Sequence, residues 1–242
     1  YLISEGKDGS LWVGTSQNGV YFSPDGLGGK SFSMLTRKNG LIGDSIRRVI
    51  QDSEDNIWIA QSGGVSKLQQ NYKAFQTYTA DSKAGESPVL PSPGVQTVRL
   101  GDHPEKDSMW IGTNKGLVIR TPSGLVDVID SDEGLTDPSV WVQCHDAKGR
   151  IWFNAASSLG VVTFAGTPPP KGFQDTKSID IAGKRATLSL KPWDDPRGYS
   201  CLADNLKSKT EKIGRDAVCF SGSRHIECWT EDGSWTILDK EY

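Results

Sequence analysis

The chain of 242 residues has no cluster of charge of one sign. Its 27 basic and 30 acidic residues give a net charge of -3 and are spread along the sequence. Nucleic-acid binding needs a concentrated basic surface that releases counterions from phosphates, so we expect no nucleic-acid partner. Apolar runs are also short, and none approaches the roughly 20 residues that a helix needs to cross a bilayer. We therefore expect no direct insertion into a membrane.

Histidine and cysteine are scarce, with three and four residues. The cysteines form no CxxC pair and have no zinc-type spacing with histidine, so the sequence predicts neither a structural metal site nor a cofactor. Their redox state has two open alternatives, disulfides in an oxidising compartment or reduced core thiols. The cysteines concerned are Cys144, Cys201, Cys219 and Cys228. The GxSxG, Walker-type and HExxH motifs and a Cys/His nucleophile pair are absent as well.

Glycine and tryptophan, by contrast, are plentiful, with 27 and 8 residues. The glycines stand in polar clusters between short apolar runs, which is typical of strands joined by turns. One segment recurs about every 45 residues, a period that indicates a repeat architecture. It consists of an acidic or glycine turn followed by Leu, Ile or Met, then Trp and a further apolar residue. The recurrences are centred on Trp12, Trp58, Trp110 and Trp152.

Each repeat can be divided into four strands by apolar alternation and turn residues. In the second repeat the expected strands are 45–51, 56–61, 64–68 and 74–79. Four antiparallel strands per repeat are typical of a propeller blade. The sequence therefore predicts an all-β chain, a β-propeller with five or six four-stranded blades. We expect a single domain over 1–242, with regular blades in 1–165 and degenerate blades with an irregular insertion in 166–242.

The recurring Trp is expected to pack between neighbouring blades, because burying an aromatic ring contributes about 2–3 kcal/mol. The alternative is carbohydrate stacking. The oxygen-rich run 52–56 lacks the spacing of a calcium loop, so we interpret it as a turn that Asp52 caps, and Asp146 is expected to act likewise.

The C-terminal part matches the repeat less well. Residues 223–233 align with it when Glu227 takes the Trp position. The stretch from Trp152 to Glu227 is too long for one repeat, so either a degenerate blade forms around 180–188 or one blade contains an excursion. Two alternatives also stay open for ring closure: the two ends of the chain pair with each other, or further blades complete the ring.

The repeat resembles the two-component regulator propeller repeat. Residues 49–64 and 141–152 are close matches, and the likeness covers about 1–165. This family is known mainly from periplasmic sensor regions of bacterial hybrid histidine kinases and from secreted bacterial proteins. It is similar to streptogramin-lyase-type propellers. The resemblance implies a propeller fold, a sensor-type or secreted binding role, and a periplasmic or extracellular location.

Four residues on the expected first strands of blades are candidate ligand contacts. Arg47 and Arg48 must point to opposite faces of their strand, so one of them can line the channel and attract an anion, although solvated strand residues are the alternative. His145 lies beside an acid at a strand end, where it could act as a general base or as a metal ligand. The alternative is a hydrogen bond to nearby backbone. Trp141, on the same strand, is the fourth candidate. No catalytic residue is predicted.

Three functions are compatible with these features. The first is a non-catalytic domain that binds a small molecule, a glycan or a protein at the channel mouth. The second is a metal-assisted lyase of the streptogramin-lyase type that uses His145. The third is a structural building unit of a larger assembly. The sequence leaves the oligomeric state open.

Overall fold

The chain forms five antiparallel sheets that follow one another along the sequence. The computed structural model describes residues 2–69, 75–80, 90–173, 175–193, 200–203, 217–221, 225–230 and 233–239. Over these ranges the regular structure is strand, apart from two single turns of 3-10 helix, η1 (Gly26–Gly28) and η2 (Arg37–Asn39). The all-β prediction is confirmed.

The first three sheets, here called blades 1 to 3, each contain four consecutive strands. Blade 1 comprises β1 (Leu2–Glu5), β2 (Leu11–Gly14), β3 (Val20–Ser23) and β4 (Ser33–Leu35). Blade 2 comprises β5 (Ile46–Gln51), β6 (Ile57–Gln61), β7 (Gly64–Leu68) and β8 (Phe75–Thr79). Blade 3 comprises β9 (Val95–Gly101), β10 (Ser108–Thr113), β11 (Gly116–Arg120) and β12 (Val126–Ile129).

Blade 4 has five strands, in the order β13-β14-β15-β17-β16. They are β13 (Val140–His145), β14 (Ile151–Ala155), β15 (Ser158–Phe164), β16 (Asp175–Ile181) and β17 (Lys184–Pro192). The long β17 pairs with β15 on one side and β16 on the other. The degenerate blade considered around 180–188 is therefore wrong, because this hairpin extends blade 4 instead of starting a new sheet.

Blade 5 consists of β18 (Ser200–Ala203), β19 (Val218–Ser221), β20 (His225–Thr230) and β21 (Gly233–Asp239). The placement of Glu227 at the Trp position is wrong, because that position belongs to a second strand and Glu227 lies on the third. The directly opposite residues Cys219 and Cys228 form a disulfide between β19 and β20. Cys144 is also disulfide-bonded. The side chain of Cys201 lies outside the described part.

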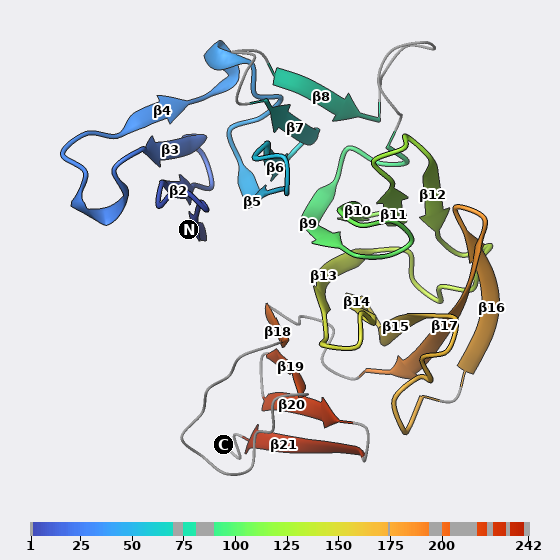
Figure 1. Ribbon diagram of the computed structural model, residues 1–242. Coiled ribbons are helices and arrows are strands. Elements are labelled where there is room, and N and C mark those ends of the chain that lie inside the picture. The colour runs from blue at the N-terminus through green and yellow to red at the C-terminus, as the bar shows by residue number, and fades with distance from the viewer. Residues whose placement is uncertain are drawn as a thin grey trace.

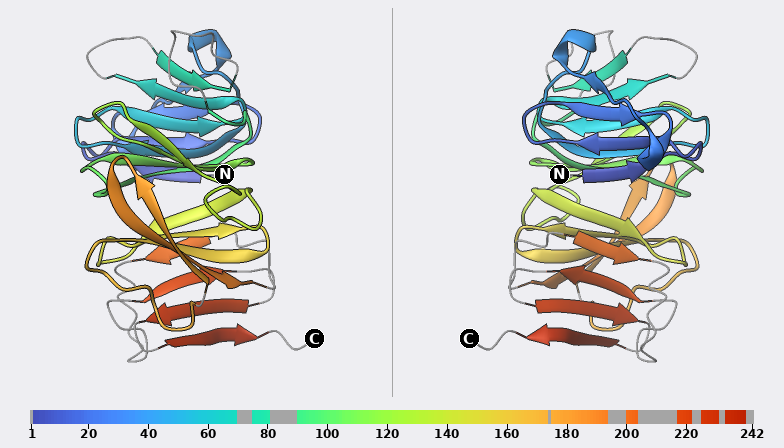
Figure 2. Two further views of the ribbon diagram at one scale, coloured as in Figure 1. Left: turned by 90° about the vertical axis from the view of Figure 1, so that its right-hand side faces the viewer. Right: turned by 90° about the vertical axis from the view of Figure 1, so that its left-hand side faces the viewer.

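The blades are arranged as an arc around a common axis (Figure 1). The first strand of each blade lies on the inner side of the arc, and the strands β1, β5, β9, β13 and β18 contact one another in that order. The side views show the strands of successive blades stacked face to face (Figure 2). Among the described residues, no strand pairing joins blade 1 to blade 5.

The recurring Trp residues are core residues, as predicted. All four, Trp12, Trp58, Trp110 and Trp152, are at most 5% exposed. Each lies on the second strand of its blade and packs toward the following blade. Trp58, for example, shares a cluster with Val98 and Met109 of blade 3. The adjacent residues of the same strand point to the opposite face, as strand alternation requires, and Ile57 and Ile59 pack toward blade 1.

A buried aspartate fixes the Trp ring in two blades. The Oδ2 atom of Asp52 accepts a hydrogen bond of 2.8 Å from Nε1 of Trp58, and its Oδ1 atom accepts from the backbone amides of Glu54 and Asn56. Asp146 has the same relation to Trp152, six residues later, at 2.8 Å. The carboxylate thus closes the turn and satisfies the buried indole N–H. The interpretation of both aspartates as turn caps is confirmed.

Candidate functional site

The innermost strands of blades 2, 3 and 4 each contain a β-bulge near their start. The register of β5 shifts between Ile46 and Arg48, and that of β13 shifts between Val140 and Val142. In β9 the pairing with β10 moves from Thr97 to Val95. A bulge leaves one extra residue unpaired and redirects its side chain. The three extra residues are Arg47, Gln96 and Trp141.

These three residues define the inner rim, a name used below for Arg47, Gln96 and Trp141. They occupy corresponding positions on the neighbouring strands β5, β9 and β13, which follow one another along the inner side of the arc (Figure 1). Their side chains therefore lie at one end of three adjacent blades. The sequence predicted Arg47 and Trp141, but it did not predict Gln96.

The inner rim offers a cation, an amide and an aromatic ring to solvent. Trp141 is 40% exposed, in contrast to the buried Trp of the repeat, and its Nε1 donates to Oγ of Ser139 at 2.5 Å. Arg47 is exposed. The Nε2 atom of Gln96 donates to Oδ1 of Asn114 at 2.8 Å, which orients the amide. Such a surface can combine stacking with hydrogen bonding.

Arg48 does not belong to the inner rim. It borders a cleft between blades 1 and 2 that Trp12 also lines. Its Nε atom is buried and has no hydrogen-bond partner, and loss of hydration lowers the pKa of its guanidinium group. The two adjacent arginines therefore differ in environment, since Arg47 is exposed and Arg48 is only partly so.

His145 lies at the far end of β13 from Trp141. Its ring packs on Gly101 of β9 so closely that a Cβ atom on this glycine would lie 2.5 Å from Nε2. This Nε2 atom is buried and has no hydrogen-bond partner. Burial lowers the pKa of His145 to about 4, although the nearby carboxylates of Asp102 and Asp146 act in the opposite direction. The structure thus separates His145 from the other candidates and buries its Nε2 atom.

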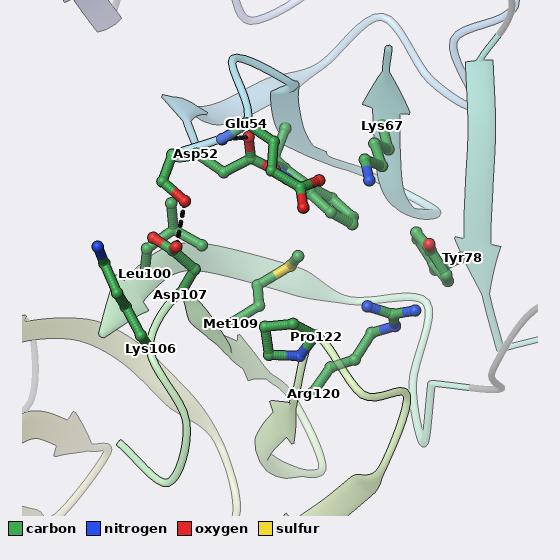
Figure 3. Close-up of a pocket in the computed structure, with 12 residues that line it drawn as sticks. Asp52, Glu54, Lys67, Tyr78, Leu100, Lys106, Asp107, Met109, Arg120 and Pro122 are labelled. Carbon is green, nitrogen blue, oxygen red and sulfur yellow. Dashed lines mark hydrogen bonds between the residues drawn. The ribbon is translucent and has the colours of Figure 1, made fainter. Parts of the chain in front are cut away.

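A second hollow lies between blades 2 and 3 (Figure 3). This cleft, called the 2–3 cleft, has a volume of about 230 Å³. Blade 2 contributes Trp58, Lys67 and Tyr78 from β6, β7 and β8, and blade 3 contributes Met109 and Arg120 from β10 and β11. Because its walls come from different blades, spacing along the sequence gave no signal for it.

Two of the three cations that line the cleft lie over aromatic rings. The Nζ atom of Lys67 is 5.0 Å from the centre of the Trp58 ring, and the guanidinium carbon of Arg120 is 5.1 Å from the centre of the Tyr78 ring. The two rings stack on each other with centres 5.5 Å apart. Burial raises the pKa of Tyr78, and the charge of Arg120 opposes this shift.

Three carboxylates, those of Asp52, Glu54 and Asp107, also line the 2–3 cleft, together with a third cation, Lys106, which lies beside Asp107 (Figure 3). The carboxylate of Asp52 is occupied by the turn and by Trp58, as described above. Asp107 accepts a hydrogen bond from Oγ of Ser53, which links blade 3 to blade 2. The cleft therefore carries charges of both signs, and Lys67 and Arg120 lie over its aromatic rings.

In the described part of the chain no three His, Cys, Asp or Glu side chains gather in a group that could hold a metal ion. The same residues contain no helix of the length and apolarity needed to span a membrane.

Comparison with known proteins gives matches among solved structures. No family model matches the chain, and no curated protein matches it. A catalytically inactive variant of virginiamycin B lyase from Staphylococcus aureus is 12% identical, with a TM-score of 0.64 over 98% of this chain and 68% of that chain. The chain has a β-propeller fold.

Two further propellers are larger than this chain. The extracellular domain assigned to a hybrid two-component system of B. thetaiotaomicron is 18% identical, with a TM-score of 0.55, and the match covers 98% of this chain and 34% of that domain. PorZ, a surface component of the type-IX secretion system of Porphyromonas gingivalis, is 12% identical, with a TM-score of 0.56 and coverage of 99% and 33%. The chain thus spans about a third of these two proteins. Identities this low show the fold alone, and at that level the likeness to sensor-type and lyase-type propellers is confirmed.

Proposed function

We propose that the chain is a non-catalytic binding domain whose ligand is a small molecule, a glycan or a protein held at the inner rim. The observation that carries this proposal is the contrast between Trp141 and the repeat tryptophans. The indole of Trp141 is 40% exposed at a bulge, whereas Trp58 and Trp152 are almost fully buried. Exposed aromatic residues on a rigid scaffold are typical of binding surfaces.

The chemistry of the inner rim favours a glycan. The indole face of Trp141 can stack on the apolar face of a sugar ring. Arg47 and Gln96 can supply hydrogen-bond donors to hydroxyl or carboxylate oxygens. Small molecules and proteins are the other outcomes of the test below.

We further propose a periplasmic or extracellular location. The disulfide between Cys219 and Cys228 supports it, because disulfides persist mainly in oxidising compartments. One of the similar structures is described as an extracellular domain and another as a bacterial surface component.

A glycan array followed by titration calorimetry tests the binding proposal. Trp141→Ala and Arg47→Ala should each weaken binding of the best array ligand by about tenfold or more, as loss of a binding hot spot does. Leu27→Ala is the control, because Leu27 is 89% exposed on η1 of blade 1, away from the rim strands. Affinity that neither rim variant reduces would contradict the proposal, as would the absence of any ligand in arrays and pull-downs.

The two alternative functions make different predictions. The lyase alternative requires that His145→Ala or a chelator abolishes an activity, and the covered Nε2 atom of His145 gives that role no support. The building-unit alternative requires a stable assembly, which light scattering would detect.

A further inference from the structure

Within the part of the chain that the structure describes, Lys67 and Arg120 have no acid partner. Neither takes part in the ion pairs found among the described residues. Arg120 donates through one terminal nitrogen to the carbonyl of Thr121 at 3.4 Å, but its Nε atom is buried and has no hydrogen-bond partner. A buried donor left without a partner is unfavourable, so this arrangement favours a ligand that accepts the bond.

A similar cation elsewhere in the chain does have its acid. Lys191 lies 5.3 Å from the ring centre of Trp229, much as Lys67 lies over Trp58, but it also pairs with Glu227 at 3.5 Å. A lysine over a buried indole is thus neutralised between blades 4 and 5. In the 2–3 cleft no described carboxylate pairs with Lys67, so its charge is available to a ligand.

The walls next to the two cations are apolar. Met109 and Tyr78 are buried and line the cleft, and Pro122 lies between Met109 and Arg120 (Figure 3). The charged ends of Lys67 and Arg120 both point toward the part of the cleft next to the Tyr78 ring (Figure 3). A guanidinium group presents two parallel N–H donors to a carboxylate, and a second cation nearby strengthens the contact.

We propose that the 2–3 cleft is a second binding site, independent of the inner rim, that takes a small organic acid. Its carboxylate lies between Lys67 and Arg120, and its apolar body packs on Met109, Tyr78 and Pro122.

Calorimetric titration of the whole chain with sodium 3-phenylpropionate tests the proposal. The neutral amide of the same acid should bind at least about tenfold more weakly, because it loses the charge-assisted bonds. Lys67→Met and Arg120→Met should each weaken binding of the acid by about 10- to 100-fold. Both changes keep an unbranched apolar stem over the ring. Lys191→Met is the matched control and should leave the affinity unchanged.

The outcomes decide between the proposal and its competitors. Absence of binding, equal affinity for acid and amide, or affinity unchanged in both variants would overturn it. Inorganic phosphate binding as tightly as the acid would also overturn it, because the apolar body would then have no role. The variant Arg120→Met can melt at a lower temperature because Tyr78 loses its partner. In that case the affinity of Lys67→Met for the acid alone tests the proposal. Trp141→Ala should leave this binding intact, which separates failure here from failure at the inner rim.

Discussion

Replacing Asp146 by alanine tests how the repeat is held together. The buried carboxylate accepts hydrogen bonds from Nε of Arg150 at 2.5 Å and from Nε1 of Trp152 at 2.8 Å. It also accepts from the backbone amides of Lys148 and Arg150, at 2.9 Å and 3.0 Å. The side chain of Arg150 is only 2% exposed, so this ion pair is shielded from water.

The expected cost follows from what the carboxylate contacts. Removing one partner of a buried ion pair typically costs about 3–5 kcal/mol, because the remaining charge cannot regain its hydration. Asp52 provides a matched comparison, since it holds the same turn and indole but contacts the neutral side chain of Asn56 instead of an arginine. Its loss leaves neutral buried donors and should cost about 1–3 kcal/mol. We therefore expect Asp146→Ala to be the more damaging change by about 2 kcal/mol.

Urea unfolding followed by tryptophan fluorescence measures these free energies. The double variant Asp146→Ala/Arg150→Met removes both charges and should recover a large part of the loss, because apolar replacement of a buried pair is often neutral. Two results would refute the reasoning. One is equal destabilisation by Asp146→Ala and Asp52→Ala, and the other is a double variant less stable than Asp146→Ala alone.

Three further predictions concern pH, oxidation and packing. The pKa of His145 is near 6.5 in the unfolded chain but about 4 in the fold, so the unfolded chain binds more protons between these values. The free energy of unfolding should therefore fall by about 3 kcal/mol as the pH drops from 6.5 to 4. The variant His145→Asn should flatten this part of a profile of melting temperature against pH. Replacing Cys219 and Cys228 by alanine opens a short loop and should cost about 2–3 kcal/mol in urea unfolding. Gly160→Ala should destabilise by about 1–3 kcal/mol, because the new Cβ would lie 2.1 Å from the buried Phe153 ring.

Each of these predictions has a control or a contrary result. Gly28→Ala should be nearly neutral, because no atom lies within 4 Å of the added Cβ. Iodoacetamide labelling of the oxidised chain at Cys219 would contradict the disulfide. A pH profile that His145→Asn leaves unchanged would place the acid sensitivity in other groups.

The regular blades could be predicted because their signals are local. In blade 2 the expected strands 45–51 and 56–61 differ from β5 and β6 by one residue at the start. The Asp turn, the buried Trp and the alternation around it all lie within one short segment, so they can be recognised without knowledge of long-range contacts.

The C-terminal blades could not be predicted in the same way. The sequence around Glu227 matches the repeat, yet its strand is the third of blade 5, where Trp229 and the Cys219–Cys228 disulfide supply the packing. The hairpin of β16 and β17 joins blade 4 through pairing between β15 and β17. Such pairing depends on contacts between distant segments, and a repeat period does not encode them.

The candidate sites were partly visible in the sequence. Arg47 and Trp141 could be named as first-strand residues, but the bulges that redirect them could not, because one extra residue hardly disturbs the apolar pattern of a short strand. Gln96 was missed for this reason, although it follows Val95 as Trp141 follows Val140. The positions Lys67 and Arg120 come from different blades and meet only in the fold.

The contrast between two blade interfaces shows how binding can arise on a repetitive scaffold. Between blades 4 and 5, Lys191 over Trp229 is paired with Glu227, so the cation serves packing. Between blades 2 and 3, Lys67 over Trp58 has no such acid among the described residues, and Arg120 adds a second charge and an unsatisfied buried Nε atom. The cation and the ring are common to both interfaces, so neither can distinguish a binding site from a structural contact. The presence or absence of a neutralising carboxylate does distinguish them, and therefore the 2–3 cleft, rather than the 4–5 interface, is the place to look for an acid ligand.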